Sequence, residues 1–202
     1  MPDNLIDYKD FRERCFSIFP TMETERFLLL KCDKAYEKDY ESLLSDDEVM
    51  KYSGTEIFDL KKQIKLYLEH LINDYSNKKG IHWVIIDKVH YKFIGEIGIY
   101  NLDLYSNRCE IGYTILKKYW RNKVATECIK RVLKFAFKEL YMHKVVAIID
   151  INNDPSIKLV ESLGFKEEGM LKEHYYNYKE KSYINVELWA MIRKEEIYSK
   201  VM

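Results

Sequence analysis

The sequence predicts an α+β domain, and three observations lead to that fold class. A chain of 202 residues has the length of one domain and can bury a core without disulfides. Apolar runs typical of strands, such as 145–151, alternate with segments that repeat apolar residues at helical spacing, such as 124–140. Seven glycines and three prolines exclude collagen-like and low-complexity chains.

The first half of the chain begins with an expected short helix or extension in residues 1–22, which ends near Pro20. One domain is expected to occupy residues 23–202. Its first elements follow from their apolar patterns: a strand at 26–32, helices at 35–44 and 59–75, and strands at 81–87, 93–100 and 109–116, the last two joined by a turn at 101–108.

The second half predicts alternating helices and strands, followed by a hairpin. An apolar stripe predicts a helix at 124–140, and the β-branched run 145–151 predicts a strand covered on both faces. A short helix is expected to start with Asp154 as N-cap and Pro155 as its first residue, and to end before Gly164. The predicted hairpin comprises residues 165–175 and 183–192.

Charge is balanced over the whole chain but not locally. Lys plus Arg and Asp plus Glu each number 33, which gives no overall attraction to nucleic acid or to an anionic membrane. Four cations without an acid precede the predicted helix at 124, at Lys117, Lys118, Arg121 and Lys123. Because the N-terminus of a helix attracts anions, this segment predicts a phosphate site. A solvated basic turn without a ligand is the alternative.

The four cysteines are scattered through the sequence. They have no spacing typical of a zinc site, and neither do the five histidines, so no metal is expected. No secretory signal precedes the domain, and the longest apolar runs are too short to span a bilayer. These features predict a cytoplasmic chain with reduced, buried thiols that does not act at a membrane.

Four segments of the sequence carry a family resemblance. They are Tyr119 to Glu127, Glu25 to Leu29, Glu110 to Tyr113, and Asn153 to Phe165. In this order they resemble the acetyl-CoA pyrophosphate loop, the opening strand, the central strand and the closing signature of the GNAT N-acetyltransferases. The branch that they resemble is that of the ribosomal-protein N-terminal acetyltransferases. Together they span about residues 23–195.

The resemblance implies a mixed, mostly antiparallel sheet of about seven strands, splayed in the middle and flanked by about four helices. It implies an acyltransferase that moves the acetyl group of acetyl-CoA directly to a primary amine, on a protein N-terminus or a small molecule. The expected partners are therefore acetyl-CoA and an amine, without nucleic acid, and the expected state is a monomer or homodimer. A non-catalytic CoA-binding or interaction protein is the alternative.

That alternative rests on the pyrophosphate loop. The family normally has glycine where this chain has Arg121 and Lys123, and glycine lets backbone amides approach the phosphates closely. Either the loop keeps its shape and the added cations strengthen phosphate binding, or affinity for acetyl-CoA is lost. The first interpretation is favoured, because Ala125 and Thr126 still match the entry to the helix.

The resemblance also suggests catalytic residues. Glu110, on the strand before the loop, is the predicted base that takes a proton from the amine, with Glu96 on the neighbouring strand as the second choice. Either could instead be a structural carboxylate. Ser156 is the predicted proton donor to the departing thiolate, although a serine at a helix start is also a common cap.

The remaining predicted site residues are of two kinds. Those expected to contact acetyl-CoA are Tyr113, Thr114 and Ile115 through backbone pairing, Arg121, Asn122, Lys123, Val124, Ala125 and Thr126 at the phosphates, and Asn153 near the pantetheine arm. Tyrosines are expected to line the acceptor cleft, with most of them serving packing: Tyr36, Tyr40, Tyr52, Tyr100, Tyr175, Tyr176 and Tyr178. No histidine is assigned to catalysis.

Overall fold

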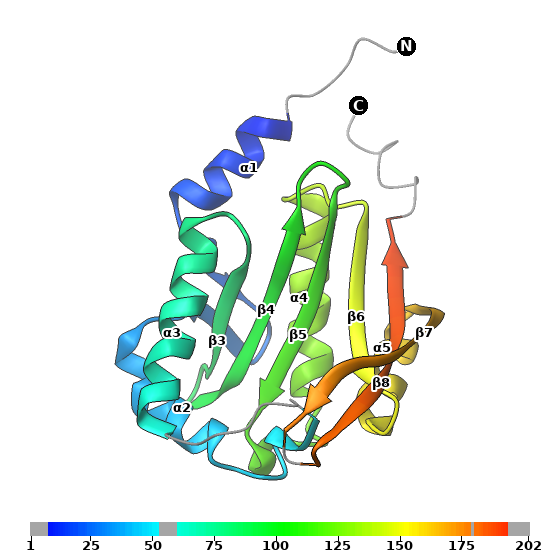
Figure 1. The fold of residues 1–202 in the computed structure, drawn as a ribbon. Helices are drawn as coiled ribbons and strands as arrows, with labels where there is room; N and C mark the ends of the chain where they lie inside the picture. The colour runs from blue at the N-terminus through cyan, green and yellow to red at the C-terminus, as the bar shows by residue number, and fades with distance from the viewer. Residues whose placement is uncertain (1–7, 53–59, 179, 194–202) are drawn as a thin grey trace.

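A computed structural model describes residues 8–52, 60–178 and 180–193, and contains one sheet in those ranges (Figure 1). The strands are β1 (Met22–Glu23), β2 (Phe27–Lys31), β3 (Ile81–Asp87), β4 (Phe93–Asp103), β5 (Arg108–Ile115), β6 (Lys144–Asp150), β7 (Lys166–Asn177) and β8 (Ser182–Ile192). The α-helices are α1 (Tyr8–Ser17), α2 (Glu37–Leu44), α3 (Leu60–Ser76), α4 (Val124–Lys138) and α5 (Asp154–Leu163).

The predicted α+β class is confirmed, and the differences are local. The described part of the chain has eight strands, because the two-residue strand β1 adds itself to the edge of the sheet. The short helix expected before the domain is α1. The N-cap of α5 is Asn153 and not the predicted Asp154, since the Asn153 side chain accepts from the backbone N–H of Ser156. Asn and Asp cap helices almost equally well, so composition alone could not place the boundary.

The sheet order is β1-β2-β3-β4-β5-β6-β8-β7. Neighbouring strands are antiparallel except β5 and β6, which run parallel. Pairing between β5 and β6 covers only Arg108 to Glu110 against Lys144 to Val146 within the described residues. Beyond that point the two strands diverge (Figure 1). The splay expected in the middle of the sheet is therefore confirmed.

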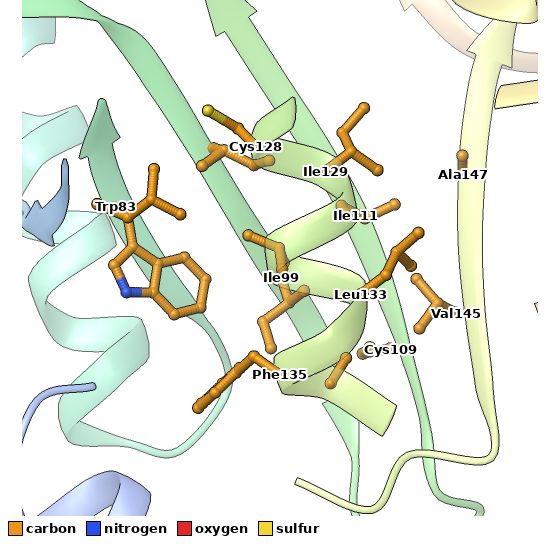
Figure 2. Packing of buried hydrophobic residues seen from close by; sticks show 14 of the residues in the cluster. Trp83, Ile99, Cys109, Ile111, Cys128, Ile129, Leu133, Phe135, Val145 and Ala147 are labelled. Carbon is orange, nitrogen blue, oxygen red and sulfur yellow. The ribbon is translucent and has the colours of Figure 1, made fainter. Parts of the chain in front are cut away.

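One face of the sheet packs on α4. The inner side of this helix presents a continuous apolar stripe, which includes Cys128, Ile129, Leu133 and Phe135, to the strands (Figure 2). Trp83 of β3 lies at the end of this layer, fully buried. Burial of such a stripe on a broad sheet supplies most of the stability of a helix in water.

The opposite face packs on α2 and α3. Alternation along β3 sends Val84 and Ile86 to this second apolar cluster, whereas Trp83 and Ile85 join the first. Leu43 of α2 also lies in the second cluster, and its side chain is inaccessible to solvent. The two helices thus cover the β3–β4 end of this face and leave the area around the splay to polar side chains.

All four cysteines are free thiols. Burial is the largest cause that raises the pKa of Cys15 to about 11 and the pKa values of Cys32, Cys109 and Cys128 to about 12. Cys32, Cys109 and Cys128 are buried as expected, whereas Cys15, on α1, is only partly buried. None of the described helices combines the length and apolar composition needed to span a bilayer.

Candidate active site

A cavity of about 350 Å³ passes through the splay between β5 and β6. Its walls come from both faces of the sheet. On the α3 side it is lined mainly by polar and aromatic residues, namely Tyr52, Tyr67, His82, Glu96, Gly98, Tyr100, Gly112 and Thr114. On the α4 side the lining includes Ile111, Tyr113, Ile129, Asn153, Ser156, Val160 and Phe165. We call these two parts the acceptor chamber and the thioester chamber.

Glu96 is the buried carboxylate of the acceptor chamber. Its side chain accepts hydrogen bonds from two tyrosine hydroxyls, that of Tyr40 at 2.7 Å and that of Tyr67. Burial raises the pKa of Glu96, although the hydrogen bonds from Tyr67, Tyr40 and Thr114 act in the opposite direction. The chamber therefore contains a buried carboxyl group that hydroxyl donors hold in one orientation.

His82 lies beside Glu96 in the same chamber. Its Nε2 is 3.3 Å from Oδ2 of Asp74 on α3. On the other side of the ring, Nδ1 lies directly over Gly98, where an added Cβ would come within 2.5 Å of it. The ring of Tyr100 is parallel to the imidazole, with centroids 6.3 Å apart. Glycine at position 98 is required for the histidine to occupy this place.

The thioester chamber contains a hydroxyl pair. The Tyr113 hydroxyl lies 3.0 Å from Oγ of Ser156, the third residue of α5. Because Asn153 caps the helix, the Ser156 hydroxyl is not used as the cap and faces Tyr113 instead. This pair spans the splay from β5 to α5 and can deliver a proton there.

The edge of β5 that faces the splay presents backbone groups. The N–H of Leu116 bonds to the carbonyl of Ile94, so alternation directs the backbone groups of Thr114 toward β4 and those of Tyr113 toward β6. The carbonyl of Ile115 accepts from the Trp120 indole at 2.7 Å. Of the three residues predicted to pair with an extended ligand, Tyr113 is therefore the best placed.

The basic loop before α4 has a backbone that glycine would normally adopt. Arg121 has φ 60° and Lys123 has φ 59°, both in the left-handed region. Lys123 is the N-cap of α4 and makes no side-chain cap hydrogen bond, so the first N–H groups of the helix, from Val124 to Thr126, face outward. The loop thus keeps a glycine-like shape with two cationic side chains on it.

The cations of this loop differ in their surroundings. Lys117 forms an ion pair with Glu48 at 2.7 Å. Arg121 and Lys123 are exposed, and within the described residues neither has an acidic partner. The free positive charge next to the helix N-terminus therefore comes from these two residues, which is the arrangement expected of an anion site.

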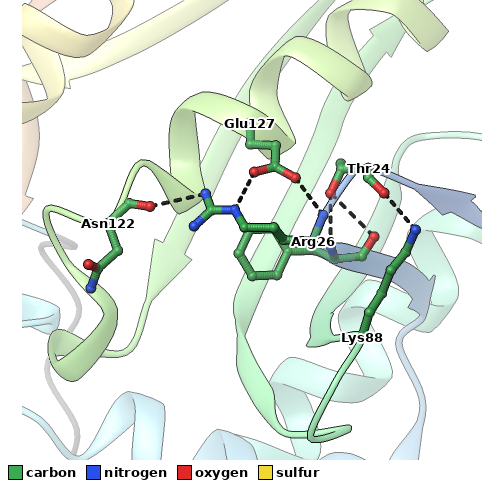
Figure 3. A network of polar contacts seen from close by, with 6 residues as sticks. Thr24, Arg26, Lys88, Asn122 and Glu127 are labelled. Atoms are coloured by element: carbon green, nitrogen blue, oxygen red, sulfur yellow. Dashed lines mark hydrogen bonds and ion pairs between the residues drawn. The ribbon is translucent and has the colours of Figure 1, made fainter.

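A network around Arg26 holds the loop against the sheet (Figure 3). The Arg26 guanidinium donates to Glu127 of α4 at 2.7 Å and to the carbonyl of Asn122 at 3.0 Å, and its backbone N–H donates to the same carboxylate. Although burial raises the pKa of Glu127, these bonds and one from Thr24 lower it overall. The opening strand thus fixes the start of α4.

The predicted base Glu110 lies outside the lining of the cavity. It accepts a hydrogen bond from the Asn101 side chain at 3.0 Å and stands opposite Tyr100 in the β4–β5 ladder. The negative charge of Glu110 is among the causes that raise the pKa values of Tyr100 and Tyr175, after burial. Glu110 therefore lies at the rim of the acceptor chamber, whereas its predicted alternative Glu96 lies inside it.

The predicted tyrosines fall into four groups. Tyr52 and Tyr100 line the cavity, and Tyr40 supports Glu96 from behind. Tyr36 packs against Phe93, away from the cavity, and the others extend along the exposed hairpin as Tyr175, Tyr176 and Tyr178. Tyr67 and His82 also line the cavity, although neither was predicted as a site residue. His82 had one available signal, since it is a polar residue within the apolar strand 81–87.

Comparison with known proteins identifies the family of the chain. A family profile described as an acetyltransferase (GNAT) domain matches residues 26–166. The chain is 31% identical over 159 residues to YoaA, an uncharacterized N-acetyltransferase of Bacillus subtilis, with 79% of this chain and 90% of YoaA covered.

Two solved structures share the fold at low sequence identity. RimJ of Mycobacterium smegmatis, solved with CoA-disulfide, gives a TM-score of 0.77 at 18% identity, covering 87% of this chain and 88% of RimJ. The spermidine N-acetyltransferase of Vibrio cholerae, solved with CoA and spermine, gives 0.74 at 19% identity, covering 85% and 98%. Because the family profile spans most of the chain, the protein belongs to the GNAT family of acetyl-CoA-dependent acyltransferases.

Proposed function

We propose that the protein transfers the acetyl group of acetyl-CoA to a cationic primary amine, carried by a protein N-terminus or a small molecule. The observation that carries the proposal is the cavity through the splay. It joins a chamber with a buried carboxylate, Glu96, to a chamber with the Tyr113–Ser156 hydroxyl pair. An amine and a thioester can meet there without a covalent intermediate on the protein.

The thioester chamber suits the leaving thiolate. Attack of the amine nitrogen forms the C–N bond and breaks the C–S bond, which leaves an electron pair on sulfur. Ser156 donates its hydroxyl proton to that sulfur and takes one from Tyr113, which lies within hydrogen-bonding distance. Burial raises the pKa of Tyr113, so this hydroxyl is protonated at neutral pH.

The basic loop and the edge of β5 suit two parts of acetyl-CoA, its diphosphate and its pantetheine arm. Arg121, Lys123 and the outward N–H groups of α4 can bind the diphosphate of CoA. The backbone of Tyr113 can pair with the pantetheine amides as an added strand would. Such a substrate is made and used in the cytoplasm, where we place the protein, as a monomer or a homodimer.

Calorimetric titration with acetyl-CoA, followed by a thiol-release assay with a panel of peptides and small amines, tests the proposed function. We expect binding and acetylation of amines that are cationic at neutral pH. Binding without transfer to any amine would favour the alternative of a non-catalytic CoA-binding protein. Absence of binding at millimolar acetyl-CoA would exclude both.

Removing the hydroxyl pair is expected to slow turnover without weakening binding. Ser156→Ala and Tyr113→Phe should each lower kcat about tenfold, because the thiolate then leaves without a positioned proton donor. The affinity for acetyl-CoA should stay within about threefold of wild type, since neither hydroxyl is at the phosphate loop. Ser162→Ala, on the exposed face of α5, is the matched control. Unchanged kcat in both variants would contradict the role of the pair.

Replacing Lys123 by glycine is expected to stabilise the fold and weaken acetyl-CoA binding. Relief of the left-handed backbone strain should raise the free energy of unfolding by about 1–2 kcal/mol. The greater conformational entropy of glycine in the unfolded chain should offset about 0.4–1 kcal/mol of this gain. The exposed side chain does not obstruct the loop, so loss of its charge should raise the Kd two- to fivefold, about 0.4–1 kcal/mol, at low salt.

Urea unfolding and calorimetry measure the two effects of Lys123→Gly separately. Lys138→Ala removes the same charge from the opposite end of α4 and should leave the Kd unchanged. A lower Kd in Lys123→Gly would mean that the lysine side chain hinders the phosphates, contrary to this expectation.

A further inference from the structure

We propose that His82 is the group that takes the proton from the attacking amine, and that Asp74 positions it for this role. The inference rests on the proposed acetyl transfer and assigns its proton acceptor. It arises from three features of the acceptor chamber: the Asp74–His82 contact, the place of Nδ1 over Gly98, and the row of glycines that leads from there to the splay.

Asp74 determines which ring nitrogen can accept a proton. A carboxylate only accepts hydrogen bonds, so the contact of 3.3 Å requires that Nε2 of His82 carries the hydrogen. In the neutral imidazole, Nδ1 then has a free electron pair. Both side chains are 13% exposed, which keeps water from replacing the contact easily.

The glycine row connects Nδ1 to the thioester chamber. In the sheet register His82 stands opposite Gly98, and Gly98 stands opposite Gly112 on β5, at the edge of the splay. Neighbouring strands are about 4.8 Å apart, so the row is about 10 Å long. The His82 ring occupies the space over Gly98 and the Tyr100 ring that over Gly112, and the cavity that both rings line leaves room for an amine or one water molecule between Nδ1 and the splay.

The Tyr100 side chain lies directly on the second glycine of the row. A Cβ on Gly112 would lie 3.0 Å from the Tyr100 hydroxyl, so that hydroxyl is held over the second glycine. Burial raises the pKa of Tyr100, and it remains a hydrogen-bond donor at neutral pH. The amine nitrogen therefore lies in a slot with an acceptor at one end, His82, and the splay at the other.

The cationic amine first releases one proton to solvent, because an ammonium nitrogen has no electron pair with which to attack. As the nitrogen bonds to the thioester carbonyl carbon, its N–H becomes acidic and the proton passes to Nδ1, directly or through one water. The sulfur takes the bond electrons and the proton from Ser156, Ser156 takes its replacement from Tyr113, and the Tyr113 phenolate is reprotonated from solvent. The imidazolium formed is stabilised by the Asp74 carboxylate and later releases its proton to solvent.

The surroundings of the ring determine its state at rest. Burial lowers the pKa of His82, and the hydrogen bond and charge of Asp74 only partly offset this. Among the described residues, the titratable groups around it are Asp74, His70 and Tyr67 on α3, Tyr52 before α3, Glu96 and Tyr100 on β4, and Glu110 on β5. The imidazole is consequently neutral at pH 7 and able to act as a base.

Steady-state kinetics over a pH range test the proposal. His82→Gln should lower kcat/KM about a hundredfold. In the wild-type protein, kcat/KM should fall at a pH below the ordinary pKa of histidine, and this acidic limb should be missing in the variant. His82→Ala should recover activity when imidazole is added. His70→Gln is the matched control, because His70 also approaches Asp74, at 3.6 Å, but is on the solvent side, and its profile should equal wild type.

Asp74→Asn tests whether Asp74 orients the His82 ring for proton transfer or only packs against it. The asparagine amide donates to Nε2, so the imidazole hydrogen moves to Nδ1 and the acceptor is lost although His82 is intact. We expect kcat to fall at least tenfold and nitrogen-15 NMR of the imidazole to change from the Nε2–H to the Nδ1–H form.

The outcomes separate this proposal from the proposed function. Wild-type activity with unchanged kinetics in His82→Gln would overturn the role of His82 and leave acetyl transfer intact, and loss of the acidic limb in Glu110→Gln instead would assign the base to Glu110. An Nδ1–H tautomer or a charged imidazole in the wild-type protein at pH 7 would overturn the role of His82, and this NMR test needs no amine substrate. Lack of transfer with every amine would reject the proposed function itself.

Discussion

Glu96→Gln is expected to lower kcat/KM for cationic amines about a hundredfold, or about 2.7 kcal/mol, through a higher KM for the amine. The carboxylate is buried in the acceptor chamber, where its charge is weakly screened, and glutamine removes that charge while it keeps the size. Affinity for acetyl-CoA should not change, because Glu96 lies on the α3 side of the splay.

The pH dependence of the amine KM provides a second measurement on Glu96. Since burial raises its pKa, the carboxylate becomes neutral at a higher pH than an ordinary glutamate, and the wild-type KM for cationic amines should rise as the pH falls through that value. The glutamine variant should lack this rise. An aromatic amine, which is neutral near pH 7, should be acetylated equally by both proteins.

Glu69→Gln is the control for the Glu96 experiment. This glutamate is on the exposed side of α3 and pairs loosely with Lys34 at 3.4 Å, so its replacement should change kcat/KM by less than twofold. An equal loss with cationic and neutral amines in Glu96→Gln would contradict recognition of the cation and point to a role in the reaction step.

Trp83→Ala is expected to lower the free energy of unfolding by about 3–5 kcal/mol. The indole is fully buried, meets the Phe135 ring edge-on with centroids 5.6 Å apart, and donates from Nε1 to the Pro20 carbonyl at 2.7 Å (Figure 2). Alanine therefore leaves a large cavity between β3 and α4 and a carbonyl without its donor.

Urea unfolding followed by far-ultraviolet circular dichroism measures the change in Trp83→Ala. Trp83→Phe, which keeps an aromatic ring and loses the hydrogen bond, should lose less than half as much stability. Leu66→Ala, at a position 55% exposed on α3, should cost less than about 0.5 kcal/mol. A loss below 1 kcal/mol in Trp83→Ala would mean that this end of the core repacks around the gap.

Local patterns predicted most of the fold and little of the site. The strand 81–87 and the helix 124–140 followed from the spacing of their apolar residues, and both were found within two residues of their predicted ends. The prediction of an acetyl-CoA-dependent acyltransferase is confirmed by the family match. That prediction depended on short ordered motifs and not on composition.

What the sequence did not reveal depends on pairing between distant segments. His82 and Gly98 lie opposite each other only because β3 and β4 pair in that register, and Asp74 reaches the histidine from a different element. Propensity likewise gives no reason to expect left-handed backbone at Arg121 and Lys123, because unbranched cationic residues rarely adopt it. Roles of Glu110 and Ser156 in catalysis stay predictions.

The low reactivity of the cysteines allows CoA release to be followed with a thiol reagent. With pKa values of about 11 to 12, the four thiols carry almost no thiolate at neutral pH, so a disulfide reagent in solution reacts with released CoA before it reacts with the protein. Cys32, Cys109 and Cys128 are also buried, so labelling of these three requires opening of the fold. The same reagent, without substrates, therefore gives the rate at which the domain opens, and Cys128 on α4 reports on the layer that supports the phosphate loop.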